Sequence, residues 1–430
     1  MLPFLTGLLL TAVALRADDY AARFRQAAAY SQQGNYEQAI LQYQAALQIR
    51  PGAPEALNNL AVMYYEARRY AEAFSTASQI WESHGELQSA ALITGLAAVQ
   101  CNRPRDAIAP LKKLLSSDPT NRDALFGLAS AYYALNELSE AIAIYNLDIA
   151  HSPKDANAWY GLAICYERMA ENASKKLSQM PGGAGYSKRL LAEYLQSAGN
   201  SKLAAEAFGE AEINDTASSP EAGKQYELAC KLAGQSRNAF EQFIHLAPDS
   251  WQAAVFLGDV DRQHGSLSSA LTHYQKAAEE QPKNPAPLLG LGTVYWELGD
   301  FDHAIPYLRE TLQLNPQSSQ AVFELANIAV RRHSYAEAVP LLKQYLTLQP
   351  DALAAHADLG RAYLHLEQYQ DAVTELTKAD GVDEEGNIHY QLSVALRKLG
   401  RTQGADAALK RSMEIRESRS KREQRLHAVQ

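Results

Sequence analysis

The feature that most constrains this chain is a small residue that recurs every 34 positions. Two runs of alanine show the spacing: Ala39, Ala73, Ala107 and Ala141, and then Ala270, Ala304, Ala338 and Ala372. Three further series keep the same step, namely a second small residue, an aromatic residue and a proline. Within one period they are Gly292, Tyr295 and Pro316. Self-similarity at a fixed period of this length indicates that each period is one supersecondary unit that stacks on its neighbours.

The residue types within a period resemble the tetratricopeptide repeat, whose helix A carries the pattern W-x2-L-G-x2-Y. Residues 159–166 read WYGLAICY and residues 288–295 read LLGLGTVY. Small residues at the crossing points let helix backbones approach to about 8–10 Å. Glycine favours the left-handed position that ends helix A, and this predicts turns at Gly34, Gly199, Gly265, Gly299 and Gly400. The resemblance implies an all-α fold, a right-handed α-α superhelix (solenoid) of about twelve tetratricopeptide helix–turn–helix repeats.

The phase of the repeat divides the chain. Residues 18–155 are interpreted as repeats 1–4 and residues 251–417 as repeats 8–12, while residues 418–430 form a charged cap or tail. Between them, 156–250 is too short for three full periods, and it is interpreted as three compressed or irregular repeats 5–7. The first runs from Ala156 to Ala184, the second starts near Gly185, and the third runs from Pro220 to Ser250 with Gly234 in phase. A linker that joins two shorter arrays is the alternative.

The first 17 residues are interpreted as a signal peptide. Leu2 to Leu15 is apolar and uncharged, and it is shorter than the roughly 20 residues that span a bilayer. Ala12-Val13-Ala14 has the A-x-A form of a cleavage site. No Lys or Arg precedes the apolar run, so an N-terminal helix that caps the array is the alternative. We expect a periplasmic or secreted protein with no integral membrane segment after cleavage.

Enzymatic chemistry is not indicated by any motif in the chain. The eleven histidines form no H-E-x-x-H and no metal-ligand spacing, and there is no G-x-S-x-G or phosphate-binding glycine loop. We therefore expect no catalytic residue, no cofactor and no metal. The formal charge of −9 argues against nucleic acid, which requires a clustered basic surface.

The resemblance also implies where a partner binds. In tetratricopeptide proteins the A helices line a concave groove through the second, fifth, ninth, twelfth and thirteenth positions of each unit. In repeats two to five these positions predict an apolar groove: Val62, Tyr65, Leu92, Leu96, Val99, Phe126, Tyr133, Tyr160 and Ile164. In repeats eight to twelve they predict a charged one: Asp259, Arg262, Glu297, Arg331, Arg361, His365, Arg397 and Lys398.

These observations predict a non-catalytic scaffold that binds a partner peptide or helix in the apolar groove, because an exposed apolar stripe usually marks a protein interface. Tight superhelical curvature, or a helix from the chain's own terminus, is the alternative that would cover the stripe. A regulatory or accessory subunit of a separately encoded enzyme is the alternative function. The residues indicate neither the partner nor the oligomeric state.

Overall fold

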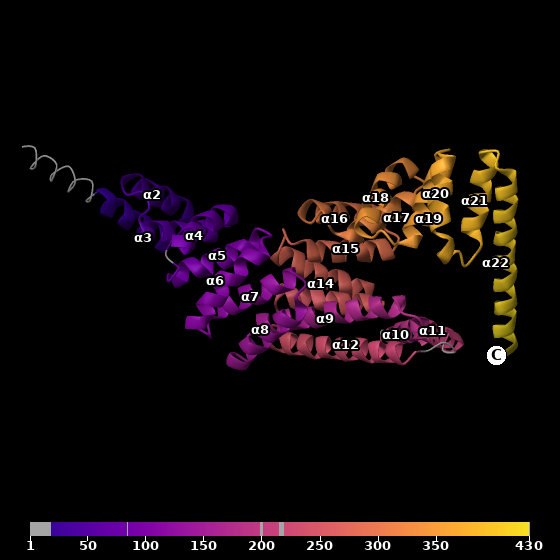
Figure 1. Ribbon diagram of the computed structural model, residues 1–430, viewed down its shortest axis with the longest axis horizontal. Helices are drawn as coiled ribbons and strands as arrows, with labels where there is room; N and C mark the ends of the chain where they lie inside the picture. The colour runs from indigo at the N-terminus through magenta and orange to yellow at the C-terminus, as the bar shows by residue number, and fades with distance from the viewer. Residues whose placement is uncertain (1–18, 84, 198–200, 215–218, 430) are drawn as a thin grey trace, which may run out of the picture. The chain divides into compact units, whose positions relative to one another are not determined.

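The computed structural model describes residues 19–83, 85–197, 201–214 and 219–429, and these residues are helical apart from turns (Figure 1). The predicted signal peptide therefore lies outside the described residues, as does the turn predicted at Gly199. The chain divides into two compact units, residues 1–248 (unit 1) and 249–430 (unit 2). The predicted all-α fold of tetratricopeptide-type helix pairs is confirmed in both.

Unit 1 begins with a helix over residues 19–32, which is followed by α2 to α12. Their bounds are α2 Tyr36–Ile49, α3 Pro54–Glu66, α4 Tyr70–Ser83, α5 Gln88–Gln100, α6 Pro104–Ser117, α7 Arg122–Ala134, α8 Leu138–His151, α9 Ala156–Gln179, α10 Gly183–Ser197, α11 Ser201–Asn214 and α12 Pro220–Leu246. Up to α8, each odd-numbered helix is a helix A and packs against the helix B that follows it. Each helix A also packs against the helix A of the next unit.

Unit 2 continues the same alternation, again with helix A odd-numbered. Its elements are α13 Trp251–Gln263, α14 Leu267–Glu280, α15 Pro285–Glu297, α16 Phe301–Leu314, α17 Ser319–Arg331, α18 Tyr335–Leu348, α19 Leu353–His365, α20 Tyr369–Lys378, the short 3-10 helix η2 Asp380–Val382, α21 Asn387–Lys398 and α22 Thr402–Val429. The predicted C-terminal cap or tail is thus the continuation of α22, which is helical to Val429.

The small-residue series lie where helices cross. All eight alanines of the first series are fully buried. A Cβ atom added at Gly161 of α9 would lie 2.2 Å from the ring of Tyr145 in α8. One added at Gly290 of α15 would lie 2.4 Å from Tyr274 in α14. The backbone therefore approaches these rings so closely that only glycine fits without rearrangement.

The turn between helix A and helix B requires a left-handed residue in both units. Gly299 makes this turn with φ of 75°, as predicted, and Gly34, Gly265 and Gly400 do the same. Other units use a residue with a side chain at the equivalent place, such as Arg68 (φ 59°) and Glu367 (φ 60°). The turn geometry is therefore kept even where glycine is absent.

Residues 156–250 do not form the three successive units that the sequence predicts. The third predicted repeat, Pro220 to Ser250, is not a helix pair, because α12 runs without interruption from Pro220 to Leu246. Helix α12 packs along α9, and the Ser236 hydroxyl donates a hydrogen bond to the Ala163 carbonyl at 3.1 Å. Ala163 belongs to the small-residue series of helix A, and Ser236 lies 34 residues before Ala270 of the helix B series. Helices α9 and α12 are thus the A and B helices of one unit, and the hairpin α10–α11 is inserted between them.

Candidate functional site

The predicted apolar groove lies on four successive A helices of unit 1. Val62 and Tyr65 are on α3, Leu92, Leu96 and Val99 on α5, Phe126 and Tyr133 on α7, and Tyr160 and Ile164 on α9. We call these nine side chains the unit 1 stripe. Helix α3 contacts α5, α5 contacts α7, and α7 contacts α9, so the residues follow one another across adjoining helices.

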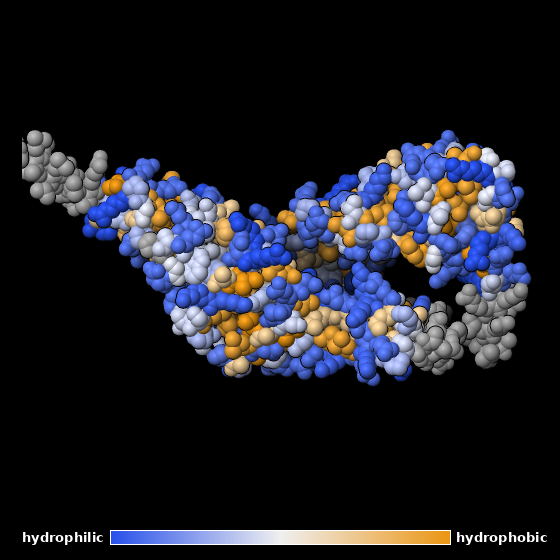
Figure 2. All heavy atoms as spheres, viewed as in Figure 1, coloured by the Kyte–Doolittle hydropathy of each residue, from blue (hydrophilic) through white to orange (hydrophobic). Residues whose placement is uncertain are grey.

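Each residue of the unit 1 stripe is at least partly exposed, although each flanks the buried core. Eight are intermediate in burial, and Phe126 is 44% exposed. Figure 2 shows apolar atoms at the surface of the part of unit 1 that α7, α8 and α9 form. Large apolar side chains that line up across four helices and remain in contact with water are typical of a surface that another molecule covers.

Several stripe residues are positioned by aromatic and cationic neighbours. The Tyr160 ring packs on Phe240 and Phe243 of α12, with centroids 6.1 and 5.2 Å away. The Arg168 guanidinium lies over the Tyr133 ring at 4.1 Å. Phe126 touches Tyr145 edge-on at 6.4 Å. Tyr160 therefore also holds α12 on α9, whereas Phe126 is the most exposed member of the stripe.

The stripe carries no charge near neutral pH. Burial raises the pKa of the Tyr65 and Tyr133 hydroxyls above the ordinary value of 10.0, even though Arg168 lowers that of Tyr133. The two tyrosines therefore remain neutral hydrogen-bonding groups at the margin of apolar side chains. Such a surface suits an apolar segment with a few backbone or side-chain polar groups.

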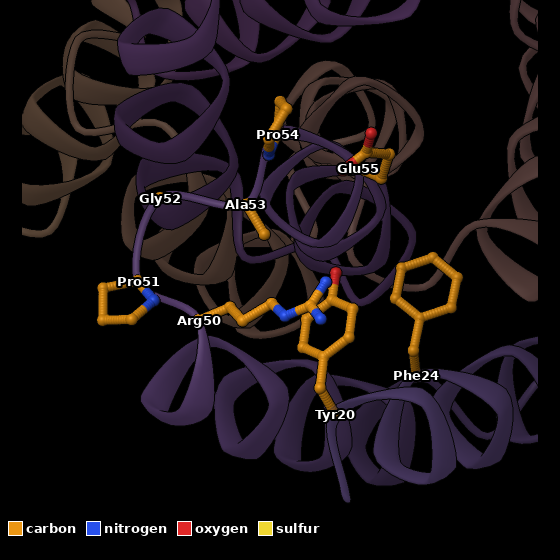
Figure 3. Close-up of a pocket in the computed structure, with 8 residues that line it drawn as sticks. All are labelled: Tyr20, Phe24, Arg50, Pro51, Gly52, Ala53, Pro54 and Glu55. Atoms are coloured by element: carbon orange, nitrogen blue, oxygen red, sulfur yellow. The ribbon is translucent and has the colours of Figure 1, made fainter. Parts of the chain in front are cut away.

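A shallow pocket of about 610 Å³ lies at the start of unit 1, between the helix over residues 19–32, the end of α2 and the start of α3 (Figure 3). Phe24 and Glu55 line it from the fifth and second positions of their units, which are groove-lining positions in the family pattern. The Arg50 guanidinium lies over the Tyr20 ring at 4.6 Å. The pocket is therefore close to the groove-lining positions at the N-terminal end of the array.

In unit 2 the side chains predicted to form a charged groove bond mainly to their own neighbours. Arg262 of α13 donates to Glu297 of α15 at 2.7 Å, and each side chain is 27% exposed. Asp259 accepts a hydrogen bond from the Tyr274 hydroxyl at 2.6 Å. Arg361 pairs with Asp358 at 3.2 Å.

The remaining predicted positions of unit 2 lie toward the ends of their A helices. The imidazole of His365 stacks on the Tyr335 ring at 4.3 Å, and Arg331 lies 5.9 Å from the centroid of Trp296. Arg397 pairs with Asp406 of α22 at 3.0 Å, while Lys398 is exposed. Charged residues are therefore present where the sequence predicts them, but most have an internal partner.

Glu324, which was not among the predicted groove residues, is a buried carboxyl group in unit 2. Its side chain is on α17, and the residue is only 3% exposed. Its carboxylate accepts hydrogen bonds from the Thr293 hydroxyl at 2.9 and 3.1 Å and from the Gln320 amide at 2.9 Å. Burial raises the pKa of Glu324 from 4.5 to about 7. The sequence signal for this residue was a carboxylate at the sixth position of its unit. Its partners could not be predicted, because Thr293 is on α15 and Gln320 is on α17, and only the fold brings them together.

Two further findings concern the described part of the chain. Within it, no three His, Cys, Asp or Glu side chains are grouped so that they could hold a metal ion. Nor does any of its helices combine the length and the hydropathy needed to cross a membrane. Cys165 is buried, whereas Cys101 and Cys230 are partly exposed, and all three are free thiols.

Comparison with known families agrees with this architecture. Models described as tetratricopeptide repeat match residues 98–163, 289–352, 329–391 and 386–419. A model described as TPR repeat matches residues 27–67 and 258–299. The chain belongs to the tetratricopeptide repeat family, whose members typically bind other proteins and are not catalysts. Most of α9 and all of α10 to α12 fall between the matched ranges, where the inserted hairpin separates the two helices of a unit.

Individual solved structures are similar over part of the chain. A structure described as MamA 41-end from Desulfovibrio magneticus RS-1 is 24% identical over 39% of this chain and 96% of its own, with a TM-score of 0.36. YrrB, described as a TPR protein with an unusual peptide-binding site, is 17% identical over 41% of this chain and 92% of its own, with a TM-score of 0.38.

Proposed function

We propose that this chain is a non-catalytic scaffold that binds an apolar peptide segment or amphipathic helix of a partner protein on the unit 1 stripe. The observation that carries the proposal is the line of nine apolar, partly exposed side chains across α3, α5, α7 and α9. Apolar burial drives most protein association, at roughly 25 cal/mol per Å² removed from water. A partner that covers the stripe would bury side chains whose exposure is otherwise unfavourable.

The aromatic side chains near the middle of the stripe should contribute most to binding the partner. Phe126 and Tyr133 on α7 lie near its middle, and aromatic side chains at the centre of an interface contribute most of its binding energy. The tyrosine hydroxyls supply neutral hydrogen bonds at the margin.

We propose the periplasm or the exterior of the cell as the location, on the basis of the apolar segment and A-x-A pattern within residues 1–17.

The direct test is Phe126→Glu in a chain that starts at residue 18. Capture of partners from the native host by cross-linking and mass spectrometry identifies the bound protein, and its affinity is then measured with purified components. A buried charge at a central position should weaken binding by 100-fold or more, or about 3 kcal/mol.

The matched control is Leu147→Glu on α8, the helix B of the same unit. Leu147 is 40% exposed, close to the 44% of Phe126, but it lies outside the stripe. Binding by the control should be unchanged, and circular dichroism should show both variants folded. Equal affinity of Phe126→Glu and the unmodified chain would refute the assignment of the stripe as the binding site.

An accessory subunit of a separate enzyme is the second candidate. In this role the partner also binds on the unit 1 stripe, but the partner is an enzyme whose activity this chain changes. If the captured protein is an enzyme whose turnover changes on addition of this chain, the accessory role is supported. An unchanged turnover supports the scaffold.

A further inference from the structure

One end of the unit 1 stripe combines aromatic rings with carboxylates. Tyr65 of the stripe lies on α3, and its ring packs edge-on against Tyr70 of α4, with centroids 5.4 Å apart. Glu66 follows Tyr65 on α3, and Asp123 is at the start of α7. Both acidic residues are exposed and occupy groove-lining positions, the thirteenth and the second of their units. We call Tyr65, Glu66, Tyr70 and Asp123 the acidic-aromatic cluster.

The two carboxylates of the cluster act on the same hydroxyl group. Burial is the main reason that the pKa of Tyr65 is raised, and after the influence of Tyr70 the negative charges of Glu66 and Asp123 raise it further. Charges at a protein surface are largely screened beyond about 8–10 Å at physiological ionic strength. Glu66 on one helix A and Asp123 two units further along the chain therefore both lie near the Tyr65 hydroxyl. Negative charge is thus concentrated beside an otherwise apolar surface.

The arginines that are near these carboxylates in the sequence already have partners. Arg122, which precedes Asp123, pairs with Asp155, and Arg69, three residues after Glu66, pairs with two other carboxylates. Within the residues that the structure describes, neither Glu66 nor Asp123 forms an ion pair. Carboxylates of the unit 2 groove, in contrast, pair across neighbouring helices. The charge of the acidic-aromatic cluster can therefore be compensated by a cation from another molecule.

We propose that the partner segment on the unit 1 stripe carries a Lys or Arg side chain that binds in the acidic-aromatic cluster, while its apolar side chains cover the stripe. The inference rests on the proposed role of the stripe and specifies the partner as a basic amphipathic segment. An ammonium or guanidinium group is attracted to the face of a tyrosine ring. The same group forms charge-assisted hydrogen bonds with carboxylates. An acidic group at this place would be repelled by both carboxylates.

The test compares two fluorescein-labelled helical peptides that share the same apolar face of Leu and Ala. One carries Lys and the other carries Gln at the positions that border this face. The stripe crosses three steps of about 8–10 Å between A helices, so each peptide has about 16–20 residues. Fluorescence anisotropy with the full chain measures both dissociation constants. We expect the Lys peptide to bind about tenfold more tightly. A Lys peptide that binds no more tightly than the Gln peptide would overturn the inference.

The paired substitutions Glu66→Gln and Asp123→Asn test whether the cluster is responsible. Together they should weaken binding of the Lys peptide about fivefold or more and leave binding of the Gln peptide unchanged. The matched control is Glu82→Gln with Glu140→Gln, which removes two exposed carboxylates from the B helices α4 and α8 and changes the net charge equally. If the control weakens the Lys peptide as much, the attraction is to overall charge and the inference is wrong.

Phe126→Ala separates this inference from the proposed function. It should weaken binding of both peptides, because it removes an apolar contact that both make. If Phe126→Ala weakens both peptides while the cluster substitutions change neither, the stripe stands as the binding surface and the recognition of a cation is refuted. If the cluster substitutions weaken the Lys peptide while Phe126→Ala changes neither peptide, the cluster binds the cation and the assignment of the stripe is refuted.

Discussion

The A helices of unit 1 and unit 2 share one backbone plan but use their groove-lining positions in opposite ways. In unit 1 nine of these positions carry the apolar side chains of the unit 1 stripe, which are partly exposed, with Phe126 as the most exposed of them. In unit 2 they carry charged and polar groups that bond across neighbouring helices, as Arg262 does with Glu297. The stacking of repeats therefore does not require any particular groove chemistry. Unit 1 leaves the side chains of its stripe partly exposed, while unit 2 uses many of its own groove side chains to connect one helix to the next.

The largest effect is expected where the two units are alike. Gly161→Val in unit 1 and Gly290→Val in unit 2 would each force a side chain into the ring of Tyr145 or Tyr274. Overpacking at such a contact should lower the free energy of unfolding by about 3 kcal/mol in either unit. Denaturant unfolding followed by circular dichroism measures it.

The control for this pair is Gly234→Ala in α12, where an added Cβ has no atom within 4 Å. Alanine is favoured over glycine inside a helix, so this change should stabilise by about 0.5–1 kcal/mol. A loss of stability at Gly234 as large as at Gly161 would show that close packing is not the cause.

The pH dependence of stability should distinguish Glu324 of unit 2 from the unit 1 stripe. Because burial raises the pKa of Glu324 from 4.5 to about 7, the folded chain binds more protons than the unfolded chain between these values. Stability from this group is therefore full below about pH 4.5 and falls as the pH rises to about 7, by about 3 kcal/mol. Glu324→Gln should remove that part of the pH dependence, as seen by comparing unfolding midpoints across this range.

The stripe of unit 1 contributes no such slope, since it has no carboxylate and partial burial raises the pKa of Tyr65 and Tyr133 above the ordinary value of 10.0. Tyr133→Phe is the matched variant, and its stability should follow the same pH curve as the unmodified chain. Identical curves for Glu324→Gln and the unmodified chain would mean that Glu324 is not the group responsible.

Added salt should weaken the stabilising interactions of the unit 2 groove but not those of the unit 1 stripe, and this effect should be smaller than the pH effect. The partly exposed Arg262–Glu297 pair joins α13 to α15, and a double-mutant cycle with alanine should give a coupling energy of about 1 kcal/mol. That coupling should decrease in about 1 M salt, where the Debye length is about 3 Å. The stability change of Phe126→Ala should be nearly the same at both salt concentrations, since it removes only apolar contact. A salt-independent Arg262–Glu297 coupling would argue that the pair is held by packing alone.

The smallest effect concerns the turns, which do not differ between units. Arg68→Gly in unit 1 and Glu367→Gly in unit 2 would each remove a side chain from a left-handed position. The left-handed conformation costs a residue with a side chain about 1–2 kcal/mol. The greater freedom of unfolded glycine offsets about 0.5–1 kcal/mol of this. We expect a net gain of a few tenths of a kcal/mol to about 1 kcal/mol at both sites. A gain in one unit only would show that the turn depends on its surroundings.

Much of the fold can be predicted from local periodicity, and the exceptions are informative. The alanines at 39 and 372 are both buried at helix crossings, because each unit contacts mainly its immediate neighbours and the same small side chain is needed at each crossing. The error at residues 156–250 has a physical cause. Tyr226, Gly234 and Phe243 are spaced like features of a repeat, but an amphipathic helix of 27 residues satisfies the same spacing. Ser236, Phe240 and Pro248, each 34 residues before its counterpart in the next unit, were the signal for the true helix B.

The candidate site, like the fold, could be predicted from the sequence only in part. The positions of the unit 1 stripe could be assigned because the family pattern specifies which face of helix A each position occupies. The partial exposure of these side chains could not be predicted, because it depends on which neighbours pack against them. Tyr160, for example, packs against Phe240 and Phe243 of α12. Likewise, charge at the unit 2 positions was evident, but the pairing of Arg262 with Glu297 follows from the offset between two stacked helices.

By itself, the sequence of this protein determines the unit, its 34-residue length, the glycines and alanines at its crossings and the apolar or charged character of each groove position. These are properties of residues within one helix pair, and their physical requirements are local. Only the tertiary structure decided that α9 pairs with α12 across an inserted hairpin, through contacts such as that between Ala163 and Ser236, 73 residues apart. It also decided that Glu324 is buried among Thr293 and Gln320. Such pairings depend on which surfaces meet after the chain has folded, and no local pattern specifies them.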